Sequence, residues 1–296
     1  MILIADSGAT KTDWLVQHRS LSYLIKTEGI NPFHQNDEKI ESIVREGLIP
    51  QFISVGTIDT ESDTTSESSI MKQIDAIYFY GAGCLPTHID GISRILHSYF
   101  PNAAIQINTD LLGAARALCG HQRGIACILG TGANSCLYDG EQIERNISPL
   151  GYILGDEGSG AYLGKRFVGD CFKEQLPSFL RDGLLEEFNL TYTEIINKVY
   201  REPQANRFLA SLTPYIYKQK EVPEVHTFLI DCFETFFRRN VLPYRSDLPV
   251  SFTGSISWYF QEEVKEAANN LGLQTGTFLK NPIEGMALFH KTSFDK

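Results

Sequence analysis

Apolar positions near the start of the chain follow the pattern of short buried strands. Residues 2–5 form an apolar run that ends at the polar turn of residues 6–10, and two further extended segments follow at residues 12–17 and 21–26. An apolar run of this length, stopped by turn residues, is typical of a buried strand. The pattern therefore predicts three strands in succession, with a tight turn between the first two.

Helical and extended patterns alternate over the rest of the first half. Helical periodicity marks residues 36–48, 89–100 and 111–118, whereas residues 74–80 and 103–108 have the pattern of strands. The intervening segment 57–69 is polar and of low complexity. Such a composition predicts a mobile surface loop and leaves a regulatory role open.

The opening arrangement returns in the second half of the chain. Residues 124–129 form an apolar run, residues 130–133 a glycine turn, and residues 135–138 and 142–146 two further strands joined by Asp139-Gly140. The repeat indicates two halves of related architecture. Helical patterns then dominate residues 157–242, and the last segments are a strand at 250–253, a helix at 257–271, a strand at 274–278 and a helix at 283–289.

Length and composition fit a globular protein of two domains. The chain has 296 residues, of which 43% are hydrophobic and 21% charged. This composition is typical of a soluble enzyme, and the length exceeds what one hydrophobic core usually accommodates. We place the domains at residues 1–115 and 116–282, and expect the final segment, about 283–296, to return to the first domain.

The charge balance and the cysteines narrow the functional classes. The formal net charge is −10, and proteins that bind nucleic acid or an anionic membrane usually present a basic surface, so we expect neither partner. The six cysteines form no C-x-x-C pair and no zinc spacing, which predicts buried free thiols. No apolar run reaches the length of a membrane span and the N-terminus lacks a signal-peptide core, so we expect a cytoplasmic protein.

The first glycine turn carries groups that suit a phosphate. Gly8 lets the backbone approach an anion, and Thr10 and Thr12 offer hydroxyl donors. Lys11 supplies positive charge, and Asp6 at the strand end could hold hydrated Mg²⁺. The spacing is not that of a Walker P-loop. A plain hairpin with solvated polar residues is the alternative interpretation.

The second glycine turn is the counterpart of the first. Gly130 and Gly132 clear space for a phosphate, Thr131 can donate a hydrogen bond, and Asn134 offers both a donor and an acceptor. A lone G-T-G sequence is weak evidence for phosphate binding. Two glycine turns in a repeated arrangement, however, predict that a triphosphate is held between them.

A third glycine turn, Gly254-Ser255, joins a strand to a helix. A glycine at such a place lets adenine or ribose lie against the backbone, and the helix N-terminus favours a nearby phosphate. The alternative is an ordinary helix start with Ser255 or Ser257 as N-cap.

Acidic residues in two segments could act on an acceptor molecule. Asp110 follows a strand and begins a helix, where it could orient a hydroxyl as general base in phosphoryl transfer, or merely serve as N-cap. Residues 151–159 surround Asp156 and Glu157 with glycines. Carboxylates there could bind vicinal sugar hydroxyls. The alternative is that they only interact favourably with the positive end of the dipole of the helix that follows.

Together these segments resemble the superfamily of acetate kinase, sugar kinases, heat-shock chaperones and actin. More narrowly they resemble the N-acetylglucosamine kinase and glucosamine kinase group of the BadF/BadG/BcrA/BcrD ATPase family. The resemblance covers almost the whole chain, and residues 151–159 are close to the G-x-x-x-G-D-E-G-S signature of that group. It implies an α/β fold of two ribonuclease-H-like, actin-like ATPase domains around a central cleft. It also implies an ATP- and Mg²⁺-dependent kinase that phosphorylates a hydroxyl of an amino sugar or N-acetylated amino sugar, such as N-acetylglucosamine or glucosamine.

Carried over residue by residue, the resemblance makes Asp110 the catalytic base and Asp6 the carboxylate that binds Mg²⁺ through water. The residues that contact ATP would be Gly8, Thr10, Lys11, Thr12, Thr131, Gly132, Gly254 and Ser255. Those that contact the sugar would be Asn31, Asp110, Asn134, Gly151 and Asp156.

Some features depart from the group or leave alternatives open. The first turn reads D-S-G-A-T where many relatives have D-G-G-G-T, and residues 80–83 lack a serine that contacts the sugar in some relatives. The iron–sulfur activators of the family carry a cysteine motif that is missing around Cys127. The alternative function is a regulatory ATPase of the same fold that acts on a protein partner. Related enzymes dimerise, so the resemblance implies a homodimer.

Overall fold

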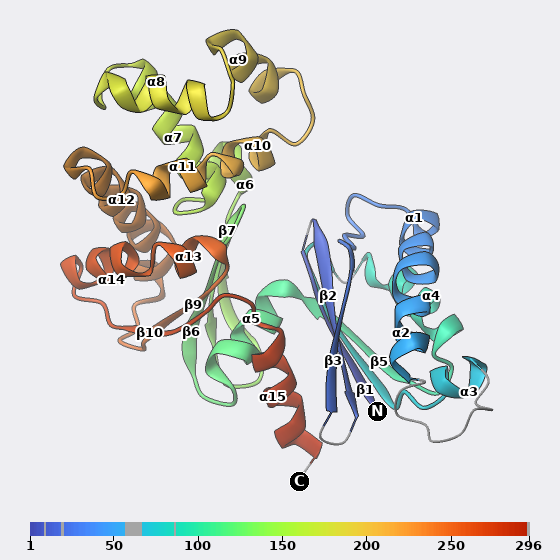
Figure 1. The fold of residues 1–296 in the computed structure, drawn as a ribbon. Helices are drawn as coiled ribbons and strands as arrows, with labels where there is room; N and C mark the ends of the chain where they lie inside the picture. Colours follow the sequence, from blue (N-terminus) through green and yellow to red (C-terminus); the bar gives the residue numbers. More distant parts are fainter. Residues whose placement is uncertain (9, 19–20, 57–66, 86, 295–296) are drawn as a thin grey trace. The chain divides into compact units, whose positions relative to one another are not determined.

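The computed structural model describes residues 1–8, 10–18, 21–56, 67–85 and 87–294. They form two compact units, one of Met1–Gly120 with Pro282–Lys296 and the other of His121–Asn281 (Figure 1). Each unit has a five-stranded sheet and a hydrophobic core of its own. Residues 57–66, which make up most of the predicted loop, lie outside the described residues, and the short helix α3 spans Glu67–Met71.

The sheet of the first unit has the strand order β3-β2-β1-β4-β5. β1, β2 and β3 form an antiparallel meander, while β4 and β5 run parallel to β1. The strands β1 to β5 are Ile2–Ser7, Lys11–His18, Leu21–Glu28, Ala76–Gly81 and Ala104–Thr109. Every residue of β4 is buried, as expected for a central parallel strand that is covered on both faces.

Helices cover both faces of this sheet (Figure 1). Because side chains alternate along a strand, Leu3 and Ala5 of β1 face one core, while Ile4 and Asp6 face the opposite side. The helices over the first face are α1 (Asp37–Ser42), α2 (Ile49–Gly56) and α4 (Ile89–Tyr99), and those over the second are α5 (Asp110–Cys119) and α15 (Ile283–Phe294).

The helix predicted over residues 36–48 begins as expected and then continues further. Asn36 is the N-cap of α1, and its side chain accepts a hydrogen bond from the Lys39 N–H. A π-helix, η1 (Ile43–Leu48), joins α1 to α2. Pro50 cannot donate a backbone hydrogen bond and should have stopped the helix. The wider π-turn before it accommodates the proline, so the prediction of an end near Leu48 was wrong.

The second unit repeats the sheet of the first, with the order β10-β9-β6-β7-β8. β6, β7 and β8 form an antiparallel meander, and β9 and β10 run parallel to β6. The strands β6 to β10 are Gly124–Leu129, Ala133–Tyr138, Ile143–Ile147, Val250–Thr253 and Thr275–Leu279. The repeat predicted from the two meanders is thereby confirmed, and so is the α/β fold of two such units.

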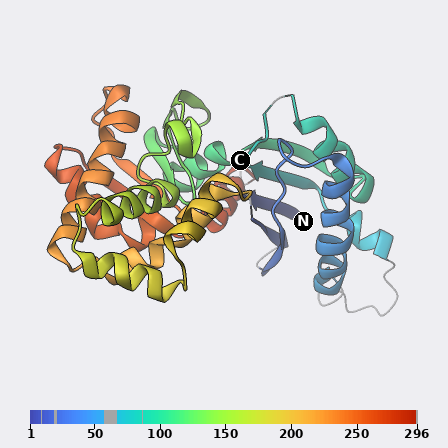
Figure 2. The ribbon, with the colours of Figure 1, turned by 90° about the horizontal axis from the view of Figure 1, so that it is seen from above.

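Helices between β8 and β9 make most of the rest of this unit, and run from green to orange in Figure 2. They are α6 (Gly151–Leu154), α7 (Gly160–Phe172), α8 (Ser178–Glu187), α9 (Tyr192–Tyr200), α10 (Ala205–Ser211), α11 (Thr213–Lys218), α12 (Pro223–Phe236), η2 (Phe237–Val241) and η3 (Leu242–Tyr244). The single helix predicted over 257–271 is instead two helices, α13 (Ser255–Tyr259) and α14 (Gln261–Asn270), which are separated at Phe260.

All six cysteines are free, and five of them are buried, which confirms the prediction of free thiols. Among the helices of the described ranges, none combines the length and the apolar character needed to cross a membrane.

Candidate active site

The C-terminal ends of three parallel strands meet at one edge of the first sheet. The register aligns Asp6 of β1 with Tyr80 of β4 and Asn108 of β5, and places Asp110 immediately after β5. Ligands of open α/β sheets bind at the carboxyl ends of the strands. This edge is therefore where side chains of the first unit can contact a substrate.

Asp110 is the first residue of α5, and the residue as a whole is partly buried. Thr109 is the N-cap, since its side chain accepts a hydrogen bond from the Leu112 N–H at 3.2 Å. The alternative interpretation of Asp110 as the N-cap is thus wrong. Its Oδ1 accepts a hydrogen bond from the Leu111 N–H at 2.8 Å. Burial raises the pKa of Asp110 despite the backbone hydrogen bonds, which act in the opposite direction.

Asp6 lies in an acidic environment. Its pKa is raised to about 7, first by burial and then by the negative charges of Asp110 and Asp13, while Lys11 lowers it. The two negative neighbours of Asp6 thus outweigh its one positive neighbour, Lys11. The residues therefore suit a hydrated divalent cation, which would supply further positive charge.

Few protein side chains are placed to bind such a cation directly. Among the described residues there is no group of three or more His, Cys, Asp or Glu side chains arranged to hold a metal ion. Mg²⁺ usually keeps several waters and takes one or two carboxylates together with substrate phosphates. Asp6 and Asp110 are the carboxylates at this edge of the first sheet.

The turn between β1 and β2 is closed by a hydrogen bond from the Gly8 N–H to the Lys11 carbonyl at 3.0 Å. Thr10 is exposed beside it. Lys11 directs its Nζ to Asp13 Oδ2 at 2.6 Å. The Thr12 side chain is fully buried, and its Oγ bonds Ser7 Oγ at 2.6 Å. Any role of Thr12 in binding ATP therefore acts through the shape of the turn.

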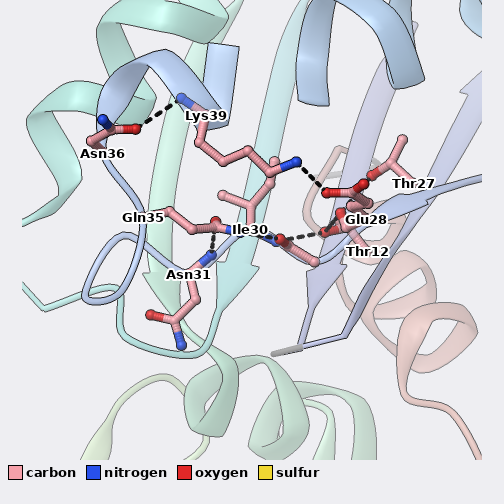
Figure 3. Close-up of polar contacts among 9 residues, drawn as sticks. Thr12, Thr27, Glu28, Ile30, Asn31, Gln35, Asn36 and Lys39 are labelled. Carbon is pink, nitrogen blue, oxygen red and sulfur yellow. Dashed lines mark hydrogen bonds and ion pairs between the residues drawn. The ribbon is translucent and has the colours of Figure 1, made fainter. Parts of the chain in front are cut away.

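The loop after β3 holds Asn31 in a fixed orientation (Figure 3). Gln35 accepts a hydrogen bond from the Asn31 N–H at 2.8 Å and donates one to the Gly29 carbonyl at 2.9 Å. Asn31 Oδ1 accepts from the Phe33 N–H at 3.0 Å. Gly83 lies against this amide, because a Cβ at Gly83 would collide with Asn31 Oδ1. Asn31 is thus positioned with its amide NH₂ as the group to offer a ligand.

The turn between β6 and β7 is bound to the start of α7. The Gly130 N–H donates to the Gly132 carbonyl at 2.9 Å, and the Gly160 N–H donates to the Gly130 carbonyl at 2.8 Å. The Ala161 N–H donates to the Thr131 carbonyl at 3.1 Å, and the side chain of Thr131 is exposed. The helix N-terminus thus fixes the shape of the turn.

Asp156 approaches this turn from a different loop. Its backbone has a φ of 54°, a conformation that is uncommon for residues other than glycine. Oδ1 accepts a hydrogen bond from the Ala133 N–H at 3.3 Å, and a Cβ at Gly132 would lie 3.1 Å from Oδ2. Burial is the main cause that raises the pKa of Asp156 to about 6. The structure thus brings together Gly132 and Asp156, which are far apart in sequence.

Asn134 and Gly151 lie on the segments next to these residues. Asn134 Oδ1 accepts hydrogen bonds from the Ser135 N–H and the Asn146 Nδ2, both at 2.9 Å. Gly151 is exposed and has a φ of 73° at the start of α6, directly after Leu150, which has a φ of 63°. Sequence periodicity gave no sign of this short helix.

Gly254 and Ser255 lie where β9 ends and α13 begins. Gly254 has a φ of 112°, and a Cβ there would collide with the Leu129 carbonyl of β6. Gly254 is the N-cap, without a side-chain hydrogen bond, while Ser257 Oγ donates to the Gly254 carbonyl at 3.1 Å. The alternative N-cap roles of Ser255 and Ser257 are therefore wrong, and the Ser255 side chain is exposed.

Comparison with solved structures relates the whole chain to one group of proteins. A proposed N-acetylglucosamine kinase from Porphyromonas gingivalis is 44% identical in sequence, with a TM-score of 0.90, over 99% of this chain and 100% of that one. The chain belongs to the N-acetylglucosamine kinase family. A second proposed N-acetylglucosamine kinase, from Chromobacterium violaceum, shares the fold at 20% identity and a TM-score of 0.71, over 97% of this chain and 98% of that one.

The fold of the N-acetylglucosamine kinase family extends to more distant proteins. A proposed N-acetylmannosamine kinase from Listeria monocytogenes is 14% identical, with a TM-score of 0.51, over 99% of both chains. No family model matches the chain, and neither does any curated protein.

Glu157, next to Asp156 in the glycine-rich segment 151–159, has a role that the sequence did not reveal. Its buried carboxylate binds Arg239 Nε at 2.6 Å and accepts from Asn240 Nδ2 at 3.2 Å. Both partners belong to the π-helix η2. Glu157, Arg239 and Asn240 also line a cavity of about 310 Å³. Only the proximity of Glu157 to glycines was visible in the sequence, because its partners lie far along the chain.

Proposed function

We propose that this protein is an ATP-dependent kinase that transfers the γ-phosphate to a hydroxyl of an amino sugar or N-acetylated amino sugar, such as N-acetylglucosamine. The likeness along the full chain to a proposed N-acetylglucosamine kinase supports the reaction class. The observation that carries the proposal is the position of Asp110 at the carboxyl end of β5, on the first turn of α5 and next to Asp6.

Asp110 acts as the base that orients the attacking hydroxyl. Phosphoryl transfer needs mainly positioning and charge stabilisation, and a general base works best when its pKa lies near the operating pH. The pKa of Asp110 is raised by burial, which moves it in that direction. Bound Mg²⁺ would neutralise charge on the phosphates, and Asp6 is the carboxylate that would hold its hydration shell.

The remaining groups divide between the two units. In the first, we assign the Gly8–Thr12 turn to the phosphates and Asn31 to the sugar. In the second, we assign Thr131 and Gly132 to the phosphates. Gly254 and Ser255 are assigned to adenosine, and Asn134, Gly151 and Asp156 to the sugar. A side chain at Gly132 or Gly254 would meet Asp156 or the Leu129 carbonyl, so the packing of the protein itself favours glycine at both positions.

A panel of sugars tests the function. Purified protein with Mg-ATP should release ADP in the presence of N-acetylglucosamine, N-acetylmannosamine or glucosamine, and much more slowly without sugar. Hydrolysis of ATP that is equally fast with and without every sugar would contradict a kinase and would favour the regulatory ATPase.

A pair of variants tests the residue. Asp110→Asn should lower the sugar-dependent rate by about 10²–10⁴-fold, as expected for loss of a general base. Asp90→Asn is the matched control, because Asp90 is an exposed aspartate in the first turn of α4 in the same unit. It should leave the rate unchanged. Equal rates for both variants would remove Asp110 from catalysis.

A further inference from the structure

Asp13 lies directly opposite Asp6 in the first sheet. The antiparallel register of β1 and β2 pairs the two residues, so their side chains project from the same face. Asp13 is only 3% exposed. Like charges directly opposite one another destabilise a sheet. Two facing aspartates are therefore an arrangement that the fold alone would not favour.

The two carboxylate oxygens of Asp13 have different surroundings. Oδ2 forms the ion pair with Lys11 at 2.6 Å, and the Lys11 side chain is 55% exposed. Oδ1 is buried and has no hydrogen-bond partner among the described residues. A buried acceptor without a donor costs free energy, because its hydration is lost and not replaced. The ion pair with a largely solvated lysine does not explain this oxygen.

The other charged groups on this face do not reach Oδ1. Lys26 of β3 is paired with Asp13 in the register, but its side chain is exposed. Asp110 adds a further negative charge beside Asp6. Lys11 is thus faced by three carboxylates, those of Asp6, Asp13 and Asp110, and Oδ1 of Asp13 has no donor among the described residues. A hydrated cation supplies both further positive charge and a hydrogen-bond donor.

We propose that Asp13 is a positioning residue for the Mg²⁺ that accompanies ATP, because its unpartnered Oδ1 accepts a hydrogen bond from a water in the hydration shell of a cation held beside Asp6. Partners of this kind orient the groups that bind a metal, and their loss typically weakens metal affinity by about 10–100-fold. The inference rests on the proposed use of Mg-ATP. It adds a residue of β2 to those that position the Mg²⁺ ion.

Titration calorimetry of ATP at a series of Mg²⁺ concentrations tests this role without turnover. Asp13→Asn should raise the apparent Mg²⁺ dissociation constant by about 10-fold or more, while ATP without metal should bind as well as to the wild type or better. Glu28→Gln is the charge-matched control. Glu28 is an exposed carboxylate on β3 of the same sheet, and its loss should leave the Mg²⁺ dependence unchanged.

The melting temperature of the metal-free protein separates this role from a structural one. If the ion pair with Lys11 were the purpose of Asp13, Asp13→Asn and Lys11→Ala would both lower the melting temperature. The proposal instead expects Asp13→Asn to raise it, because one of two facing negative charges is removed, and to reduce the rise that Mg-ATP causes. Asp13→Ser provides a second, smaller neutral variant if the asparagine does not fold.

An unchanged Mg²⁺ affinity in Asp13→Asn or Asp13→Ser, with normal Mg-ATP binding by the wild type, would overturn this inference alone. Wild-type protein that binds ATP without any effect of Mg²⁺ would overturn both the inference and the proposed function. Wild-type protein that binds Mg-ATP but phosphorylates no sugar would contradict the proposed function, while the weakened Mg²⁺ binding of Asp13→Asn would still support the role of Asp13.

Discussion

The two glycine turns occupy the same place in two sheets of the same strand order, yet their surroundings differ. Next to the first turn, the register places Asp6 opposite Asp13. At the corresponding pair beside the second turn, it places Ile128 opposite Asn134. The second turn receives its carboxylate, Asp156, from a separate loop after β8.

This difference shows that the same strand order places different side chains beside the two turns. The first sheet concentrates negative side chains at its strand ends, which suits a cation and the role proposed for Asp110. At the second sheet, Gly132 lies against the side chain of Asp156 and Gly254 against the carbonyl of Leu129. All six described non-glycine residues with positive φ also lie in the second unit. The non-glycine residues with positive φ thus lie in the second unit, whereas the facing pair of aspartates lies in the first.

The glycines at the ends of β9 and β4 should show the largest difference in stability. Gly254 has a positive φ and faces the backbone of Leu129, whereas Gly81 has no positive φ and a Cβ there would meet side chains, those of Phe79 and Cys84. We expect Gly254→Ala to lower the free energy of unfolding by about 3–5 kcal/mol and Gly81→Ala by about 1–2 kcal/mol. Denaturant unfolding measures both, and equal losses would contradict the comparison.

The acidic surroundings of Asp6 predict a stability that depends on pH. An unfolded aspartate has a pKa of about 3.9, and that of Asp6 is raised to about 7 in the folded protein. The folded protein therefore keeps a proton that the unfolded chain has released, and this contribution to stability is lost as the pH rises from about 4 to about 7.

Asp6→Asn should remove that loss, so that the metal-free variant gains stability over the wild type as the pH rises through this window. Asp156→Asn is the counterpart in the second unit and should show a smaller gain, because the pKa of Asp156 is raised only to about 6. Thermal unfolding between pH 5 and pH 8 without metal would detect both. An Asp6→Asn curve parallel to that of the wild type would refute the raised pKa.

The unusual backbone of the second unit should give the smallest effect. Leu150 has a φ of 63° and a side chain that is 60% exposed. Leu150→Gly should stabilise the protein by about 0.5 kcal/mol, because relief of the left-handed conformation exceeds the added entropy of the unfolded chain. Leu85→Gly is the control in the first unit. Leu85 is 47% exposed without a positive φ, and its replacement should destabilise by about 0.5–1 kcal/mol.

The sequence predicted the frame of the protein better than the details of its site. Short apolar runs and glycine turns fixed the strands and their repetition, because local periodicity and turn chemistry determine both. Contacts between distant segments were not predictable. The packing of Asn31 on Gly83 and the binding of Glu157 by Arg239 depend on how the chain returns to the same place.

Two local features also escaped prediction, for physical reasons that lie in the backbone. The π-helix η1 connects α1 to α2, so the helical segment continues through Pro50, although proline normally ends a helix. Thr109 rather than Asp110 caps α5, which leaves Asp110 available for chemistry. Both residue types at positions 109 and 110 are good N-caps, so only the structure could distinguish them.

Single-turnover transfer of phosphate from saturating Mg-ATP to N-acetylglucosamine tests the central assignment most directly, because it separates chemistry from binding and product release. The account predicts that Asp110→Asn binds Mg-ATP as the wild type does but transfers phosphate at least about 100-fold more slowly. Transfer by Asp110→Asn at the wild-type rate would contradict it.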